Sequence, residues 1–195
     1  MTFDELCQEV YILTNRPDLV NETKSAIKAA TLKAHQSDFY SKDIFETVIQ
    51  AEEAAYIHSI DYPSIISNFR ALRYIRKLDS SGEVSGFISV ISPEDIFDLY
   101  GQNKTDVAYI AGRVIELRSS TSVQKVILGC YVFPIVAEAS YASWIAEYYP
   151  YAIVYEATRV VFKTIGYDEQ SAQYEKLVAE QFTLLRQSAL ADVGY

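Results

Sequence analysis

The first 36 residues follow a helical pattern of apolar positions. One stripe recurs at intervals of three or four, as on one face of an α-helix: Leu6, Val10 and Leu13. Thr2 and Glu5 fit a capping box in front of this stripe, with Thr2 as the N-cap. A turn over 14–18 precedes a second stripe that begins near Asn21. The pattern predicts a short αα-hairpin.

The segment 43–133 changes to the two-residue period of β-strands. Side chains alternate over 69–78, and the turn-forming segment 79–83 follows, so we expect a hairpin there. The pair Ser92-Pro93 predicts the start of a brief helix, because Ser is a favoured N-cap and Pro a favoured first helical residue. Two more strands are expected over 109–118 and 125–133, with the serine-rich segment 119–122 as the loop between them. Gly112 interrupts the first of these strands and suggests a bulge or a turn there.

The segment 140–190 returns to the helical period. Pro150 either kinks a first helix or begins the next, Gly166 is a natural residue to end a helix, and Asp168 can cap a last one. The apolar stripe of the middle part is Ile153, Ala157, Val160, Val161 and Ile165.

Taken together, these patterns predict an α+β protein. We expect one domain over 1–195, in which a helical bundle from 1–40 and 140–190 carries a small inserted β-rich subdomain at about 43–134. A chain of 195 residues, half of them apolar, is long enough to bury a core and is not expected to be disordered.

Composition narrows the possible partners. The formal charge of −9 argues against a general nucleic-acid binder, which would need a basic surface. No apolar run is long enough to span a bilayer, and the acidic start at Asp4 and Glu5 is unlike a secretory signal, so no membrane partner is expected. Cys7 and Cys130 have no metal or redox spacing and are expected as small apolar residues in a reducing compartment.

Candidate chemistry is sparse. His35 is expected to end a helix, and neither it nor His58 pairs with a Cys, Asp or Glu at ligand spacing. Nucleotide-binding glycine motifs and hydrolase motifs are absent from the sequence, and two histidines make a Ser-His-Asp site a poor hypothesis. We therefore expect no enzyme activity, no catalytic residues, no cofactor and no metal. The alternative is a small enzyme with a carboxylate site around Asp38, Asp43 and Glu46.

Tyrosine is unusually frequent, with 16 copies beside nine Phe and one Trp. Four of these tyrosines crowd around Pro150: Tyr148, Tyr149, Tyr151 and Tyr155. So many neighbouring side chains cannot all face one core on a helix, and Tyr is enriched where proteins meet proteins. We expect Tyr148, Tyr149 and Tyr151 at a subunit interface, with an aromatic-rich core as the alternative.

Basic residues gather along one predicted strand: Arg70, Arg73, Arg76 and Lys77. A solvated hairpin explains them, and the alternative is a contact of Arg70, Arg73 and Arg76 with an acidic partner, such as a tail protein, or with passing DNA.

Three stretches resemble the head-to-tail adaptor (connector) proteins of tailed bacteriophages, especially those of short-tailed phages. They are "LVNETKSAIKAATLKAHQSDFY" (19–40), "AYIAGRVIELRSSTSVQKVILGCYVFP" (108–134) and "SWIAEYYPYAIVYEATRVVFKTIGYDEQSAQYEKL" (143–177). They look like the family's long N-terminal helix, its strand pair joined by a serine-rich loop, and its C-terminal helices with a Trp before Tyr-Pro. The likeness covers about half of the chain.

This resemblance implies a structural protein of the virion neck, assembled in the host cytoplasm. Such proteins form a ring, usually of twelve copies, between the portal and the tail or nozzle, and double-stranded DNA passes through the ring. An extended C-terminal segment typically contacts the portal, and the matching residues here are Leu190, Val193 and Tyr195. The rival interpretations are a stopper or tail-completion protein, the small enzyme described above, and a soluble regulatory binding module.

Overall fold

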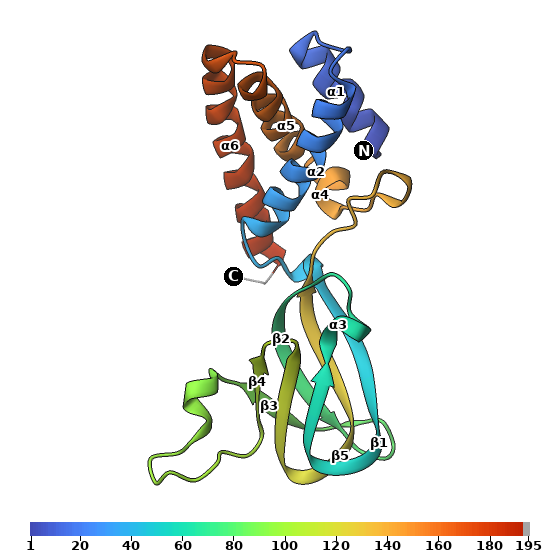
Figure 1. The fold of residues 1–195 in the computed structure, drawn as a ribbon, viewed down its shortest axis with the longest axis vertical. Coiled ribbons are helices and arrows are strands. Elements are labelled where there is room, and N and C mark those ends of the chain that lie inside the picture. The colour runs from blue at the N-terminus through green and yellow to red at the C-terminus, as the bar shows by residue number, and fades with distance from the viewer. Residues whose placement is uncertain (193–195) are drawn as a thin grey trace. The chain divides into compact units, whose positions relative to one another are not determined.

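The chain folds into two compact units. The computed structural model describes residues 1–192, with side chains described through Ser188. One unit combines residues 1–43 with the residues from Phe133 onward, and the other consists of residues 44–132 (Figure 1). We call them the helical unit and the barrel unit, and each has its own buried apolar core.

The helical unit contains five α-helices within the described residues. They are α1 (Phe3–Thr14), α2 (Val20–Gln36), α4 (Trp144–Tyr148), α5 (Pro150–Thr164) and α6 (Asp168–Asp192). Two short 3-10 turns, Ser41–Asp43 and Glu138–Ser140, complete the unit. The predicted αα-hairpin at the start is confirmed.

Local sequence signals set the ends of these helices. The capping box of α1 is present, since Thr2 Oγ1 accepts the Glu5 N–H and Glu5 accepts the Thr2 N–H. Pro150 begins α5, and Gly166 follows α5 with a φ of 80°, the left-handed conformation that favours glycine. The prediction that Pro150 separates two helices and that Gly166 ends one is confirmed.

Helix α5 lies at the centre of the helical unit. It packs against α1, α2, α4 and α6, and its buried residues lie on most of its circumference rather than on one stripe. The core of the unit is built from side chains such as Leu6, Ile27, Ile153 and Leu185. A helix enclosed in this way has little room for a charged side chain, which makes the buried Glu156 of α5 notable.

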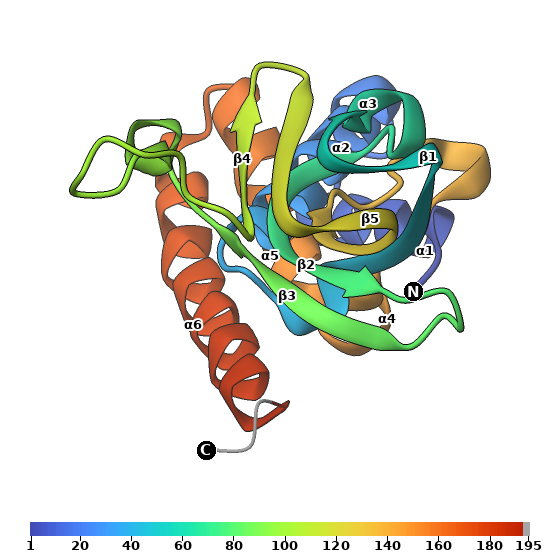
Figure 2. The same ribbon diagram turned by 90° about the horizontal axis from the view of Figure 1, so that it is seen from below.

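The barrel unit contains five strands and one short helix. They are β1 (Ile44–Asp61), α3 (Tyr62–Ile65), β2 (Phe69–Leu78), β3 (Val84–Val90), β4 (Val107–Ala111) and β5 (Val114–Val132). The sheet order is β1-β5-β2-β3-β4, and β4 also pairs with β5. Strands β5, β2, β3 and β4 therefore close into a four-strand barrel, with β1 paired along β5 (Figure 2).

The predicted fold, a helical bundle with a small inserted β-rich subdomain, is wrong. The described chain is α+β with six helices, but its strands are long and close into a barrel that has a core of its own. The error came from treating segment 119–122 as a loop. Strand β5 runs from Val114 to Val132 through this segment, although the alternation of faces breaks there: Ser119 is buried, and Ser120, Thr121 and Ser122 are all exposed where the register against β1 shifts.

Two other local predictions also need correction. The segment after Ser92 forms only a 3-10 turn, Pro93–Ile96, because the Ser92 side chain bonds to the Glu94 carboxylate rather than capping backbone N–H groups. The strand expected over 109–118 is two strands, since Gly112, with a φ of 62°, turns the chain from β4 into β5.

Candidate functional site: assembly surfaces and buried polar networks

The three tyrosines predicted at a subunit interface lie at the junction of α4 and α5, in different environments. Tyr148 is 60% exposed and Tyr151 is also exposed, whereas Tyr149 is half-buried and packs edge-on against Trp144, with ring centroids 6.4 Å apart. The structure thus leaves two of the three rings available to a neighbouring molecule.

Further aromatic rings continue from Tyr151 along α5 and onto α6. We call this set the aromatic ladder: Tyr151, Tyr155, Tyr174, Phe162 and Tyr167. Successive centroids are 5.3, 5.9, 5.7 and 6.3 Å apart, which is the range of favourable ring contacts. The two ends of the ladder, Tyr151 and Tyr167, are exposed, so it forms an ordered and partly open aromatic surface.

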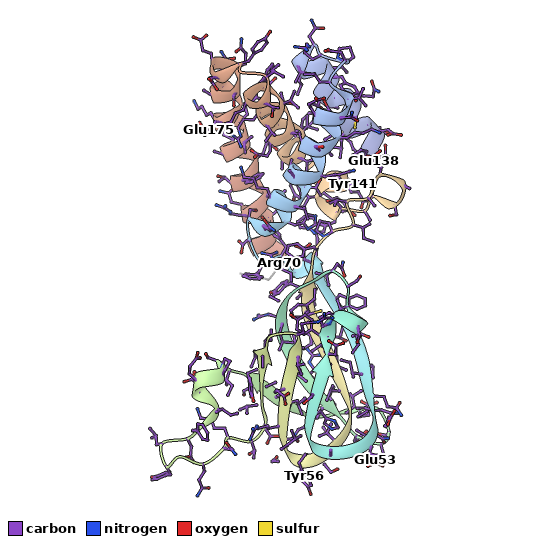
Figure 3. All side chains as sticks on the ribbon, in the orientation of Figure 1. Glu53, Tyr56, Arg70, Glu138, Tyr141 and Glu175 are labelled. Carbon is purple, nitrogen blue, oxygen red and sulfur yellow. The ribbon has the colours of Figure 1, made fainter. Side chains whose placement is uncertain are left out.

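The arginines predicted to contact a tail protein or DNA all lie on β2. Arg70, labelled in Figure 3, is half-buried. Arg73 is exposed where the register of β2 against β5 shifts. Arg76 lies over the Tyr74 ring, 4.4 Å from its centroid, and its Nη1 is 4.0 Å from the Glu46 carboxylate. The Tyr74 hydroxyl donates to the same carboxylate, and this bond raises the pKa of Tyr74.

The residues predicted to contact the portal lie at the edge of the described chain. Leu190 belongs to α6, although its side chain falls outside the described ones. Val193 and Tyr195 lie outside the described residues.

A buried hydrogen-bonded chain in the helical unit was missed by sequence reasoning. His35 Nδ1 lies 2.7 Å from Asp43 Oδ1, and His35 Nε2 lies 2.9 Å from Ser143 Oγ. A carboxylate only accepts hydrogen bonds, so Nδ1–H donates to Asp43 and the Ser143 hydroxyl donates to Nε2. His35 lies in the last turn of α2, as predicted, but its ring is buried rather than at the surface. No local motif could have found three residues so distant in sequence.

This chain has the order of groups found in serine hydrolases, but it is also engaged structurally. Ser143 is the N-cap of α4 and accepts the Ala146 N–H at 3.2 Å. Trp144 Nε1–H donates to the same Asp43 oxygen at 2.7 Å, and the Trp144 ring contacts Tyr40 edge-on. The network thereby holds the end of α2 against α4. An open depression of about 480 Å³ adjoins Ser143 and is also lined by Thr2, Glu5 and Glu147.

The structure does not bring together the three carboxylates of the alternative enzyme hypothesis, Asp38, Asp43 and Glu46. The Asp43 carboxylate is hydrogen-bonded to His35. The Asp38 carboxylate accepts a hydrogen bond from the backbone N–H of the next residue, Phe39. Glu46 belongs to β1 in the other unit. Among the described residues, no group of three or more His, Cys, Asp or Glu side chains could hold a metal ion.

Glu156 forms a second buried polar site in the helical unit. Its carboxylate accepts hydrogen bonds from Lys33 at 2.7 Å and from Arg159 at 2.8 and 2.9 Å. Burial alone would raise the pKa of Glu156, but these donors outweigh it and lower the pKa below its ordinary value. The site ties α2 to α5, and Lys33 also lies over the Phe182 ring of α6.

In the barrel unit, Lys77 is buried and paired with Asp106. Its Nζ is 2.7 Å from Asp106 Oδ1, while Ser120 donates to Asp106 from both its backbone N–H and its hydroxyl. Burial would raise the pKa of Asp106, but the bonds from Lys77 and Ser120 lower it to about 2. This pair joins β2 to the segment before β4 and to β5, where the barrel closes.

We expect Asp106→Asn to change how the barrel responds to acid. The folded-state pKa is about 2 and the ordinary value is 3.8, so the native protein gains stability above pH 3.8 and loses it as the pH falls toward 2. The Asp106 side chain is 35% exposed, so we expect a difference of only about 1 kcal/mol at neutral pH. Asn tolerates the positive φ of 57° at this position.

Urea unfolding between pH 2 and pH 7, monitored by hydrogen exchange of peptides from the barrel unit, measures this effect. The difference in the free energy of unfolding between the native protein and Asp106→Asn should narrow as the pH falls. A control variant at an exposed position, Glu53→Gln, should have the stability of the native protein at every pH. An equal gap at both ends of the pH range contradicts the assignment.

The remaining candidate residues have structural environments. The half-buried His58 donates from Nε2 to the Val123 carbonyl at 2.7 Å, beside an apolar cavity of about 260 Å³ between β1 and β5. Cys7 and Cys130 are free and buried, and burial raises the pKa of each thiol to about 11, so neither is a ready nucleophile. Within residues 1–192, no helix is long and apolar enough to cross a bilayer.

No model of a known protein family matches the sequence, and no curated protein matches it.

Proposed function

We propose that this chain is a structural protein of a bacteriophage neck, where copies of it form a ring between the portal and the tail. The observation that carries the proposal is the exposure of Tyr148 and Tyr151 at the start of the aromatic ladder. Rigid aromatic side chains at a surface are the usual anchors of protein contacts. A ring needs side-to-side contacts of this kind, and an acidic chain can border a channel in which DNA must slide.

The remaining parts of the proposal follow from the resemblance in sequence. Residues from Leu190 onward would contact the portal, Arg70, Arg73 and Arg76 would face the tail or the DNA, and no cofactor is required. The histidine network and the Glu156 site fit a structural role, since both lock helices of one unit together.

Negative-stain imaging of phage particles assembled with a labelled copy of the chain tests the proposal. We expect the label at the neck, and its absence there would contradict the assignment. Incorporation of the pair Tyr148→Ala and Tyr151→Ala should fall by about tenfold or more, if these rings are interface anchors. Tyr56→Ala is the matched control, because Tyr56 is also 60% exposed but lies in the barrel unit.

A second candidate function rests on the Asp43–His35–Ser143 chain, which has the hydrogen-bond order of a serine hydrolase. The N-cap role of Ser143 accounts for its position without catalysis. Reaction of the intact protein with a fluorophosphonate probe distinguishes the two: labelling that is lost in Ser143→Ala would favour the hydrolase. Under the neck proposal we expect no labelling, and His35→Gln should lower stability without any effect on probe reaction.

A further inference from the structure

The loop between β3 and β4 exposes an apolar tip. Leu99 is 100% exposed and Tyr100 is 88% exposed, and Phe97 beside them is also exposed. Figure 1 shows this loop, in green, projecting from the barrel at the ends of β3 and β4. Three large apolar side chains at the end of one projection are more than the scattered exposed residues of an ordinary surface.

This loop is nevertheless held in a defined conformation. Asp98 Oδ1 accepts the N–H groups of Tyr100 and Gln102, each at 2.8 Å, and the Lys104 N–H donates to the Ile96 carbonyl. Phe97 and Asn103 form an isolated antiparallel bridge that closes the tip. Because the tip is already ordered, binding through it would cost little conformational entropy.

The outer face of the barrel offers a matching surface. Register pairs place one row across four strands, which we call the outer row: Val48 on β1, Ile127 on β5, Arg76 on β2 and Phe87 on β3. The neighbouring row, in which Leu128, Ile75 and Ile88 pair, points into the core and is buried. The outer row therefore faces away from the core, and its Phe87 is 70% exposed.

Charge selects the outer row as the receptor for the loop. The loop tip is flanked by Glu94, Asp95 and Asp98. The outer row carries the Arg76 guanidinium, which stays 37% exposed although Glu46 lies 4.0 Å away, and the exposed Arg73 lies on the same strand. The apolar cavity between β1 and β5 is a poorer receptor, since Glu52 and Asp61 belong to its lining and would repel an acidic loop.

We propose that the β3–β4 loop of one copy docks its tip, Phe97, Leu99 and Tyr100, on the outer row of a second copy. Loop and receptor are different surfaces of the same barrel unit, which permits a head-to-tail contact that repeats from copy to copy until it closes. The apolar side chains supply the buried area, and Arg76 meets the acidic flank of the loop. This inference deepens the proposed ring and rests on it for the closed assembly.

Cysteine cross-linking of the full-length chain tests the contact. Two variants, Leu99→Cys and Phe87→Cys, are mixed and oxidised, both as free protein at the highest soluble concentration and in assembled particles. The native Cys7 and Cys130 are buried and do not interfere. Glu53→Cys replaces Phe87→Cys in the control mixture, because Glu53 is exposed at the bend of β1 (Figure 3).

We expect a disulfide-linked dimer of the two variants in the test mixture and none in the control. In a separate variant without added cysteines, Leu99→Asp should weaken self-association by about tenfold or more. The contact is overturned by the absence of the cross-link in both settings, or by Leu99→Cys pairing with itself alone, which indicates a two-fold symmetric contact. The proposed function is tested separately by the imaging experiment. If it fails, the labelled copy is absent from the neck of the phage particle, whatever the cross-linking shows.

Discussion

Replacing Gly129 by alanine lowers the free energy of unfolding of the barrel unit by about 3 kcal/mol, the range expected for an overpacked site. Gly129 on β5 pairs with Tyr74 on β2, and the Tyr74 ring lies directly over the glycine. A methyl group at Gly129 would come closer than 3.0 Å to ring atoms of Tyr74. The ring must leave, and its bond to Glu46 and its contact with Arg76 are lost with it.

Hydrogen exchange of peptides from 44–132 measures this loss. The double variant Gly129→Ala with Tyr74→Ala is the control, because it removes the clash. We expect it to be no less stable than Tyr74→Ala alone, so that the two changes are strongly non-additive. If Gly129→Ala leaves exchange in β2 and β5 at its native level, the close packing of ring on glycine is wrong.

Replacing Glu156 by alanine lowers the stability of the helical unit by about 3 kcal/mol, as expected when one partner of a buried ionic site is removed. Arg159 and Lys33 both donate to this carboxylate, and Arg159 is largely buried and loses its bidentate partner. The change also uncouples α2 from α5 at the centre of the unit.

Urea unfolding monitored by tryptophan fluorescence measures the stability of the helical unit separately from that of the barrel unit. Trp144 is the single tryptophan of the chain and lies in the helical unit, so its signal does not report the barrel directly. Glu156→Gln, which keeps the shape and one acceptor oxygen, should lose about 1 kcal/mol. A Glu156→Ala variant within a few tenths of a kcal/mol of native stability would show that solvent replaces the carboxylate at little cost.

The ends of several helices in the helical unit can be predicted from the sequence. Thr2, Pro150 and Gly166 each act through their own backbone and near neighbours, so their effects can be predicted without knowledge of the fold. The exposure of Tyr148 and Tyr151 does not follow from helical spacing, because Tyr148 ends α4 and Tyr151 belongs to α5.

The barrel and the buried networks depend on distant pairings. Strand β5 pairs with β1, β2 and β4 at once, and the closure depends on that register rather than on any short motif. Segment 119–122 has the composition of a loop, and it lies where the register of β5 against β1 shifts, between the pairs Ala55–Val123 and Ile57–Arg118. His35 and Ser143, 108 positions apart, become neighbours through helix packing, which composition and periodicity do not encode.

The placement of the barrel within the chain has a consequence for synthesis on the ribosome. All five strands lie within residues 44–132, so the barrel can close once that stretch has emerged. Helices α1 and α2 are made earlier but pack against α5, which is made later. A nascent chain whose residues up to about 135 have emerged would therefore hold a finished barrel beside an αα-hairpin whose apolar face is still exposed, and that intermediate is where chaperones would be needed most.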